Sequence, residues 1–471
     1  MTGWKVKPVG RFLICCLSSW PLVVASVQAA EIQMQVQAVP TAPAQASALS
    51  PTGKLLTIED AVRIGLENHP RIRSSGERIG TTEAQLGQQM SAYYPTVSLA
   101  NSYRTSQSST NGGNDHATDT YSSQAAVNLT LYNFGKREGS VQAARETVDA
   151  TKQDYATTIQ DIALAIKQSY YNYLTTIALV NVRKETVRNR ELLVKQAQGF
   201  FEVGTRAKID VARSEANLYT AQADLIAAEN AVKIAWVTLR NAMGSPRLPE
   251  QLVAQDSPEV VFTTNLSGAR NVAFDERTEL KSLEAQKRAS DQLIANARRG
   301  HLPDIIFDGS YGRRHVGDQI VNKRTLNIFP LQETWSAQLS LNIPIFDGFR
   351  TTNRVEETLH NYYNIKFQEE DRRQQIALEV EQSYLKVVET QERIKATESA
   401  ARAAKENLDL ARGRYEVGVG SIIEVTDAET LYTDAQTTYI RTVYDYKIAD
   451  AQLARAMGDN RVCVLKPGSI K

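Results

Sequence analysis

The sequence predicts a mainly α-helical protein that also carries membrane-type β-strands and is built as a tandem repeat. The 471 residues include fourteen prolines, but none lies between Pro95 and Pro246 or between Pro344 and Pro467. Such tracts favour two long helical regions over several compact domains. Segments about 200 residues apart match each other, and short runs of alternating apolar and polar residues lie beside the helical regions.

Composition excludes several classes of protein. The 54 basic and 53 acidic residues are interspersed and give a formal net charge of +1, so no basic surface for nucleic acid is expected. The mean hydropathy of -0.35 is too polar for a helical membrane protein, which needs spans of ~20 apolar residues. Three cysteines provide no disulfide framework, and Cys463 is predicted to be an inert thiol.

The N-terminus is predicted to be an export signal over residues 1–29. Lys5, Lys7 and Arg11 precede an apolar stretch, and small residues allow cleavage after Ala29 or Ala30. An uncleaved membrane anchor is the alternative. Cleavage would remove three positive charges and change the net charge from +1 to −2. Residues 30–54 are rich in Gln, Ala and Pro and are predicted to form a flexible arm.

Two tandem copies follow. Phe201-Glu202-Val203-Gly204 matches Tyr415-Glu416-Val417-Gly418 at an offset of 214 residues. Upstream the offset is 208, so the second copy has six extra residues between about 311 and 343, where a hairpin tip is expected. The predicted organisation is a first repeat over 55–250, a linker over 251–274, a second repeat over 275–458 and a tail over 459–471.

Each repeat contains a predicted β-hairpin, at about 96–132 and about 304–346, with Pro344 inside the last strand. Alternation leaves one apolar and one polar face on strands of about ten residues, which is typical of transmembrane β-strands. A hairpin on a soluble sheet would look the same locally. However, two hairpins so far apart in the chain cannot bury a sheet alone and need strands from other copies.

Four helices are predicted from the proline-free tracts and their steps of three and four residues. Each repeat is expected to have a long helix, at 136–201 and 350–415, followed by a return helix, at 208–243 and 422–457. A helix of ~66 residues would be about 100 Å long. Shorter helices are expected upstream, at 58–94 with a break at His69-Pro70 and at 276–299.

Four strands per chain cannot close a barrel, and an open sheet edge is not tolerated in lipid. A trimer would supply twelve strands, which is enough for a pore. The predicted fold is therefore a tandem-repeat protomer that forms a trimeric twelve-stranded β-barrel, continued by an α-helical barrel in the periplasm.

The repeat, the hairpins and the Phe/Tyr-Glu-Val-Gly turn followed by Ile-Asp/Glu-Val resemble the outer membrane efflux proteins of the TolC type. The resemblance covers about residues 55–460. It implies a homotrimeric exit duct in the outer membrane of a Gram-negative bacterium. The implied partners are outer-membrane lipid, a periplasmic adaptor protein and an inner-membrane pump of the resistance-nodulation-division (RND) or ATP-driven (ABC) class.

The resemblance also implies roles for residues at the helical turns. The tips that would meet the adaptor are Val203, Gly204 and Thr205 in the first repeat and Val417, Gly418 and Val419 in the second. Each could equally be a plain helix–helix turn, which also favours glycine.

Around the periplasmic entrance, Tyr415 matches a gate tyrosine of the family, and Glu424 and Asp427 match an acidic pair. Both carboxylates could instead be part of a solvated helix face. The arginine expected after the second turn is replaced by Gly420, whereas the first repeat has Arg206, and the usual aspartate is retained as Asp210. We therefore hypothesise that Arg206 pairs with Glu424 or Asp427.

No enzyme is expected, because no nucleophile–base pair, cofactor motif or metal-ligand spacing is visible. The two other readings are a periplasmic adaptor and a structural coiled-coil protein, but neither explains two repeats that each begin with a membrane-type hairpin. The sequence does not identify the cargo. We expect small-molecule efflux rather than type I protein secretion.

Overall fold

A computed structural model describes residues 56–108, 116–248, 265–320 and 332–458. All of them belong to one compact unit of the chain. The predicted signal peptide, flexible arm and C-terminal tail lie outside the described residues. Of the region from about 311 to 343, where six extra residues are expected, the structure describes 311–320 and 332–343.

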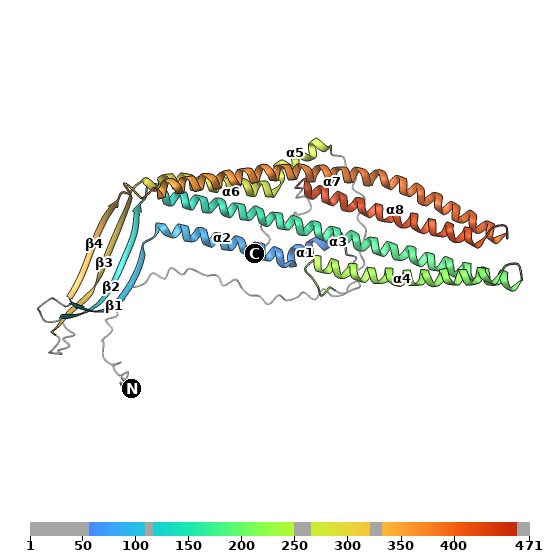
Figure 1. Ribbon diagram of the computed structural model, residues 1–471, viewed down its shortest axis with the longest axis horizontal. Helices are drawn as coiled ribbons and strands as arrows, with labels where there is room; N and C mark the ends of the chain where they lie inside the picture. Colours follow the sequence, from blue (N-terminus) through green and yellow to red (C-terminus); the bar gives the residue numbers. More distant parts are fainter. Residues whose placement is uncertain (1–55, 109–115, 249–264, 321–331, 459–471) are drawn as a thin grey trace, which may run out of the picture. The chain divides into compact units, whose positions relative to one another are not determined.

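The elements follow the same order in each half of the chain (Figure 1). The first half contains α1 (Ile58–Asn68), α2 (Pro70–Met90), η1 (Ser91–Tyr93), β1 (Thr96–Ser108), β2 (His116–Tyr132), α3 (Lys136–Glu202) and α4 (Lys208–Ala242). The second half contains α5 (Leu266–Glu276), α6 (Thr278–Arg298), η2 (Arg299–His301), β3 (Asp304–Ile320), β4 (Gln332–Asn342), α7 (Arg350–Glu416) and α8 (Ile422–Ala456).

Two predicted boundaries are wrong. The second part of the expected linker at 251–274 is helical, because Leu266–Glu276 forms α5, with the Asn265 side chain accepting a hydrogen bond from the backbone N–H of Gly268 at 2.8 Å. This helix is the counterpart of α1 at the 208-residue offset. The last strand ends at Asn342, so Pro344 lies beyond it, as its missing N–H favours.

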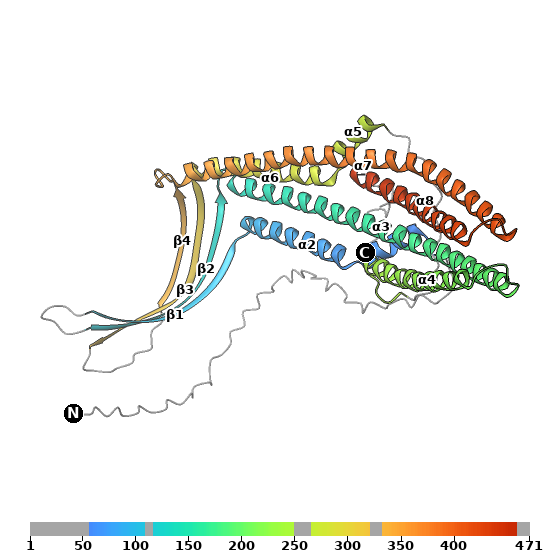
Figure 2. The same cartoon turned by 45° about the vertical axis from the view of Figure 1, so that its right-hand side comes forward.

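The four strands form one antiparallel sheet in the order β1-β2-β3-β4, and they lie side by side in both views (Figures 1 and 2). The pairing of β2 with β3 joins the two repeats. Within the described chain, β1 and β4 each pair on one side only. The sheet therefore has two open edges.

The register separates an apolar face from a polar face. Leu129, Phe307 and Leu339 are directly opposite one another on neighbouring strands, and Tyr311 is opposite Trp335. Trp335 is 77% exposed and Leu339 67%, so this face is not covered within the protomer. The opposite face, which we call the polar sheet face, is defined by the hydrogen-bonded pairs Ser102–Ser122, Ser310–Ser336 and Asn128–Asp308.

The helices of each repeat bury their own apolar core. In the first repeat α1 and α4 contribute to a cluster around Ile166 and Tyr170 of α3, and in the second α5 and α8 contribute to a cluster around Ile376 and Val380 of α7. Both views show α4 running back along α3 and α8 running back along α7 (Figures 1 and 2). None of the helices among the described residues is both long and apolar enough to cross a membrane.

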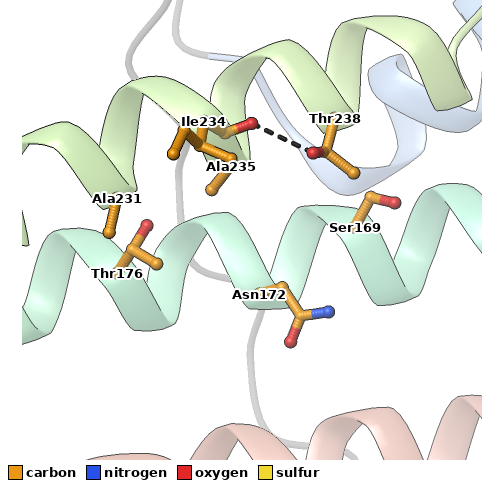
Figure 3. A pocket seen from close by; sticks show the side chains of 7 residues that line it. All are labelled: Ser169, Asn172, Thr176, Ala231, Ile234, Ala235 and Thr238. Carbon is orange, nitrogen blue, oxygen red and sulfur yellow. Dashed lines mark hydrogen bonds between the residues drawn. The ribbon is translucent and has the colours of Figure 1, made fainter.

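Uncharged side chains, most of them small, line the groove where α3 and α4 meet (Figure 3). Thr238 donates a hydrogen bond to the backbone carbonyl of Ile234 at 3.0 Å, so its hydroxyl is satisfied within its own helix. The full lining is Ser169, Asn172, Thr176, Ala231, Ile234, Ala235 and Thr238. With no charged side chain among them, the groove is suited to close helix contact rather than to chemistry.

A charged cluster joins four helices where α5 and α6 meet. The buried Arg277 guanidinium donates to Glu279 at 3.0 Å, to Glu379 at 2.7 Å and to the main-chain carbonyl of Ala456 at 3.2 Å. Arg455 contacts both Glu279 and Asp161 at 2.7 Å. A cation at the C-terminal end of α8 is favourable because the last carbonyls of a helix lack intrahelical partners. The cluster ties α3, α6, α7 and α8 together.

Burial raises the pKa of Glu279, but Arg455 and then Arg277 outweigh it and lower the pKa to about 2. A carboxyl with a lowered folded-state pKa stabilises the fold above its unfolded value, and this stability is lost as the pH falls through the folded value. We expect Glu279→Gln to lower the free energy of unfolding by about 3 kcal/mol at pH 7. The difference from the wild type should shrink between pH 4.5 and about 2.

Chemical unfolding followed by circular dichroism across this pH range tests the prediction. Glu276→Gln is the matched control, because Glu276 is exposed and, among the described residues, forms an ion pair with Lys281 alone, at 3.0 Å. A loss of stability for Glu279→Gln that does not change with pH would contradict the assignment.

Candidate functional site at the helical turns

The two turns that reverse the long helices have the same backbone geometry. Gly204 follows α3 with φ 77°, and Gly418 follows α7 with φ 82°. Their N–H groups donate to the carbonyls of Phe201 at 2.9 Å and Tyr415 at 3.0 Å, which caps both helices. A Cβ at either glycine would meet nothing within 4 Å, so the left-handed backbone rather than crowding requires glycine.

Apolar side chains project from these turns. Val203 is 71% exposed, Val417 74% and Val419 69%. Thr205, by contrast, donates its hydroxyl back to the carbonyl of Phe200 at 2.9 Å. Exposed valines at a turn are not explained by the protomer's own core, which makes these tips candidate contact points for another chain.

Arg206 links the two turns. Its guanidinium donates to the carbonyls of Gly418 at 3.0 Å and Gly420 at 2.6 Å, and it lies over the ring of Tyr415 at 5.5 Å from the ring centre. The hypothesised pairing with Glu424 or Asp427 is not formed within the described protomer. A guanidinium that holds two carbonyls across the turns instead fixes the α3–α4 tip against the α7–α8 tip.

Tyr415 is 1% exposed and lies edge-on to Phe200 at 5.5 Å between ring centres. Its hydroxyl has no hydrogen-bond partner among the described residues. Burial and then the nearby Asp210 raise the pKa of Tyr415, so the hydroxyl keeps its proton and remains a donor. The structure therefore brings Tyr415, Arg206 and Asp210 together.

The acidic pair lies on the first turns of α8. Glu424 forms an ion pair with Arg414 at 3.4 Å, and its N–H donates to the Ser421 side chain at 3.2 Å. Asp427 is exposed and has no ion pair among the residues that the structure describes. Arg414, which the sequence did not single out, is thus the local partner of Glu424.

The backbone is packed too closely at Gly420 to favour an arginine at this position of the second turn. Its N–H donates to the carbonyl of Arg414 at 2.8 Å, which folds the turn tightly back on α7. A Cβ at Gly420 would lie 3.0 Å from the backbone of Arg414 and Tyr415. A larger residue would have to shift the turn, whereas Arg206 reaches the same region from the first repeat.

A buried ion cluster behind the turns was also missed by sequence reasoning. Glu429 of α8 is 2% exposed and contacts Arg190 of α3 at 3.3 Å and Arg412 of α7 at 3.5 Å. Arg190 also donates to the carbonyl of Asn217 on α4 at 2.8 Å. A glutamate four residues after the buried Val425, on the same helix face, is the signal that could have revealed it.

The tip core surrounds these charges. It combines residues from both repeats: Leu193, Ala197, Leu408, Ala411, Tyr415, Ile422, Val425 and Ala428. Among the residues that the structure describes, no group of three His, Cys, Asp or Glu is placed to hold a metal ion. The site is thus a packed and charged junction between two helical hairpins.

The family described as Outer membrane efflux protein matches residues 62–245 and 270–459, one match for each repeat. The chain belongs to this family. Members are non-enzymatic outer-membrane channels of Gram-negative bacteria that act as trimers with a periplasmic adaptor and an inner-membrane pump. The chain is accordingly an outer-membrane exit duct that extends into the periplasm, and the predicted family and localisation are confirmed.

Several proteins are similar to this chain over most of its length. The chain is 24% identical to the outer membrane protein TolC of Salmonella enteritidis over 429 residues, 88% of this chain and 83% of TolC. It is 22% identical to the alkaline protease secretion protein AprF of Pseudomonas aeruginosa, over 84% of this chain and 83% of AprF. The open MtrE outer membrane channel of Neisseria gonorrhoeae shares the fold, with a TM-score of 0.70, 19% identity and coverage of 85% and 88%.

Burial raises the pKa of Glu429, and Arg190 and then Arg412 offset only part of this effect. We expect Arg190→Met to lower the free energy of unfolding by about 3 kcal/mol at pH 7, because it leaves a buried carboxylate poorly paired. Glu429→Gln should cost less, because it removes the buried charge as well. Acidification from pH 7 to pH 5 should reduce the stability loss of Arg190→Met, since a carboxyl whose pKa is raised takes up a proton more readily as the pH falls.

Thermal unfolding at both pH values measures these differences. Arg188→Met serves as the control, because Arg188 is exposed on the same helix. Equal losses of stability for Arg190→Met and Glu429→Gln at pH 7 would contradict the prediction. They would show that loss of the ion pairs, rather than an unpaired buried charge, determines the effect.

Proposed function

We propose that three copies of this chain form the outer-membrane duct of a small-molecule efflux system. The open edges of β1 and β4, beside an uncovered apolar face, carry this proposal. Unpaired strand edges cannot face lipid, so β4 of one copy would pair with β1 of the next and close a barrel. The polar sheet face would then line the pore.

The tips are proposed to dock on the adaptor. Val203, Val417 and Val419 offer apolar contacts at the far end of the long helices from the sheet, and Gly204 and Gly418 leave the backbone accessible. An adaptor joined to an inner-membrane pump would reach the duct from this end. Glu424 and Asp427 are proposed to favour cations at the entrance, because three copies would bring six carboxylates together.

The entrance is proposed to be held closed partly by Arg206. Arg206→Ser removes both hydrogen bonds to the carbonyls of the second turn, so we expect a several-fold rise in single-channel conductance in planar lipid bilayers. Arg213→Ser is the control, because Arg213 is exposed on α4, the helix that begins two residues after Arg206. Unchanged conductance of Arg206→Ser would rule out this role.

Deletion of the gene tests the cargo. We expect at least fourfold lower inhibitory concentrations for a panel of small toxic compounds and an unchanged set of secreted proteins. Val417→Asp/Val419→Asp should fail to restore resistance although the trimer forms, because charge at the tips disrupts an apolar contact. Val272→Asp, at a half-exposed valine of α5, should restore it.

The second candidate is type I protein secretion, which the similarity to the secretion protein AprF favours. Loss of one secreted protein with unchanged resistance would support this candidate and exclude small-molecule efflux.

A further inference from the structure

The charges on the two sheet faces differ toward the ends of the strands far from the helices. On the apolar face, Arg313 pairs with Glu333 at 3.2 Å and Thr105 donates to Asp119 at 2.8 Å. On the polar sheet face, Arg104 and Arg314 form no side-chain hydrogen bond or ion pair with any residue that the structure describes, and both are exposed. Two arginines thus remain available on the face that would line the pore.

We propose that Arg104 and Arg314, six guanidiniums in the trimer, form a basic ring in the outer part of the pore that binds the anionic groups of outgoing molecules. The proposal rests on the proposed trimeric duct, because only closure into a barrel turns the polar sheet face into a pore wall.

Strand register places the two arginines on the same face. Arg104 is opposite Thr120 on β2, and Arg314 is opposite Ser122 on β2 and Gln332 on β4. Ser122 also hydrogen-bonds to Ser102, which defines the polar sheet face. Because alternate residues share a face, Arg104 and Arg314 lie on the side opposite to Tyr103 and Tyr311.

The arginines are near enough to act together. One strand separates them, and their partners on β2 are two residues apart, so their Cα atoms are about 12 Å from each other. The side chains of Thr120 and Ser122 share the same face between them. Two guanidinium groups beside two hydroxyls suit carboxylate, sulfate or phosphate oxygens, which accept several hydrogen bonds at once.

Charge also changes along the pore wall. Asp308, six residues from Arg314 toward the helices, lies on the same face and accepts from Asn128 at 2.5 Å. At about 3.3 Å per residue it is about 20 Å away, well beyond the Debye length of about 8 Å at physiological salt. An anionic group near the arginines is therefore little affected by this carboxylate.

Block of single channels in planar bilayers by inositol hexakisphosphate tests the ring. We expect the compound to block the wild type from one side of the membrane only, with weaker block in 1 M than in 0.1 M KCl because salt screens exposed charges. Arg104→Gln/Arg314→Gln should raise the blocking concentration at least tenfold. Arg313→Gln removes one positive charge per chain from the opposite face and should leave the blocking concentration unchanged.

Open channels that are not blocked in the wild type, or are blocked equally in the double variant, would overturn the basic ring and leave the duct intact. Equal weakening by Arg313→Gln would also overturn it, because the effect would then follow total charge. Absence of any conductance would instead contradict the proposed duct itself.

Discussion

The two unpaired edges of the sheet are the constraint on which the rest of the structure depends. One chain supplies four strands, with an apolar face that its own helices do not cover. The backbone groups at β1 and β4 require partners, and in lipid no water can provide them. Assembly with identical copies satisfies both demands, so the protomer is complete only within an oligomer of an outer-membrane channel.

The two repeats share an architecture, but their charged contacts lie at different equivalent positions. The α5–α6 break holds Arg277 within a buried ion cluster, whereas the corresponding α1–α2 break holds His69, which accepts from the N–H of Arg71 at 3.2 Å. At the tips the opposite occurs, because the first repeat carries Arg206 and the second has Gly420. As a result the first repeat contacts the second at two places. Arg206 donates to the turn between α7 and α8, and Arg190 pairs with Glu429 of α8.

These ties between the repeats concern the part of the channel that must move if the entrance opens. Arg206 holds carbonyls at the surface of the turns, while Glu429 holds two arginines behind the tip core. At an exposed turn, water can replace the hydrogen bonds to the carbonyls with little loss of free energy. Separating a buried carboxylate from its arginines is much more unfavourable, because the charge is left unpaired. The outer turns can therefore move, and the Glu429 cluster is suited to restrict this movement to the tips.

The sequence by itself determined the tandem repeat, the long helices, the hairpins and the glycine turns, because each rests on local periodicity or on backbone demands at Gly204 and Gly418. The 208-residue offset also contained α5, but the weak apolar pattern of this helix concealed it. Only the tertiary structure decided the partners of Arg206 and the burial of Glu429, since both depend on which helices of different repeats lie together. It also decided that Arg104 and Arg314 share a face, because strand register is set by pairing across the whole sheet rather than by either strand alone.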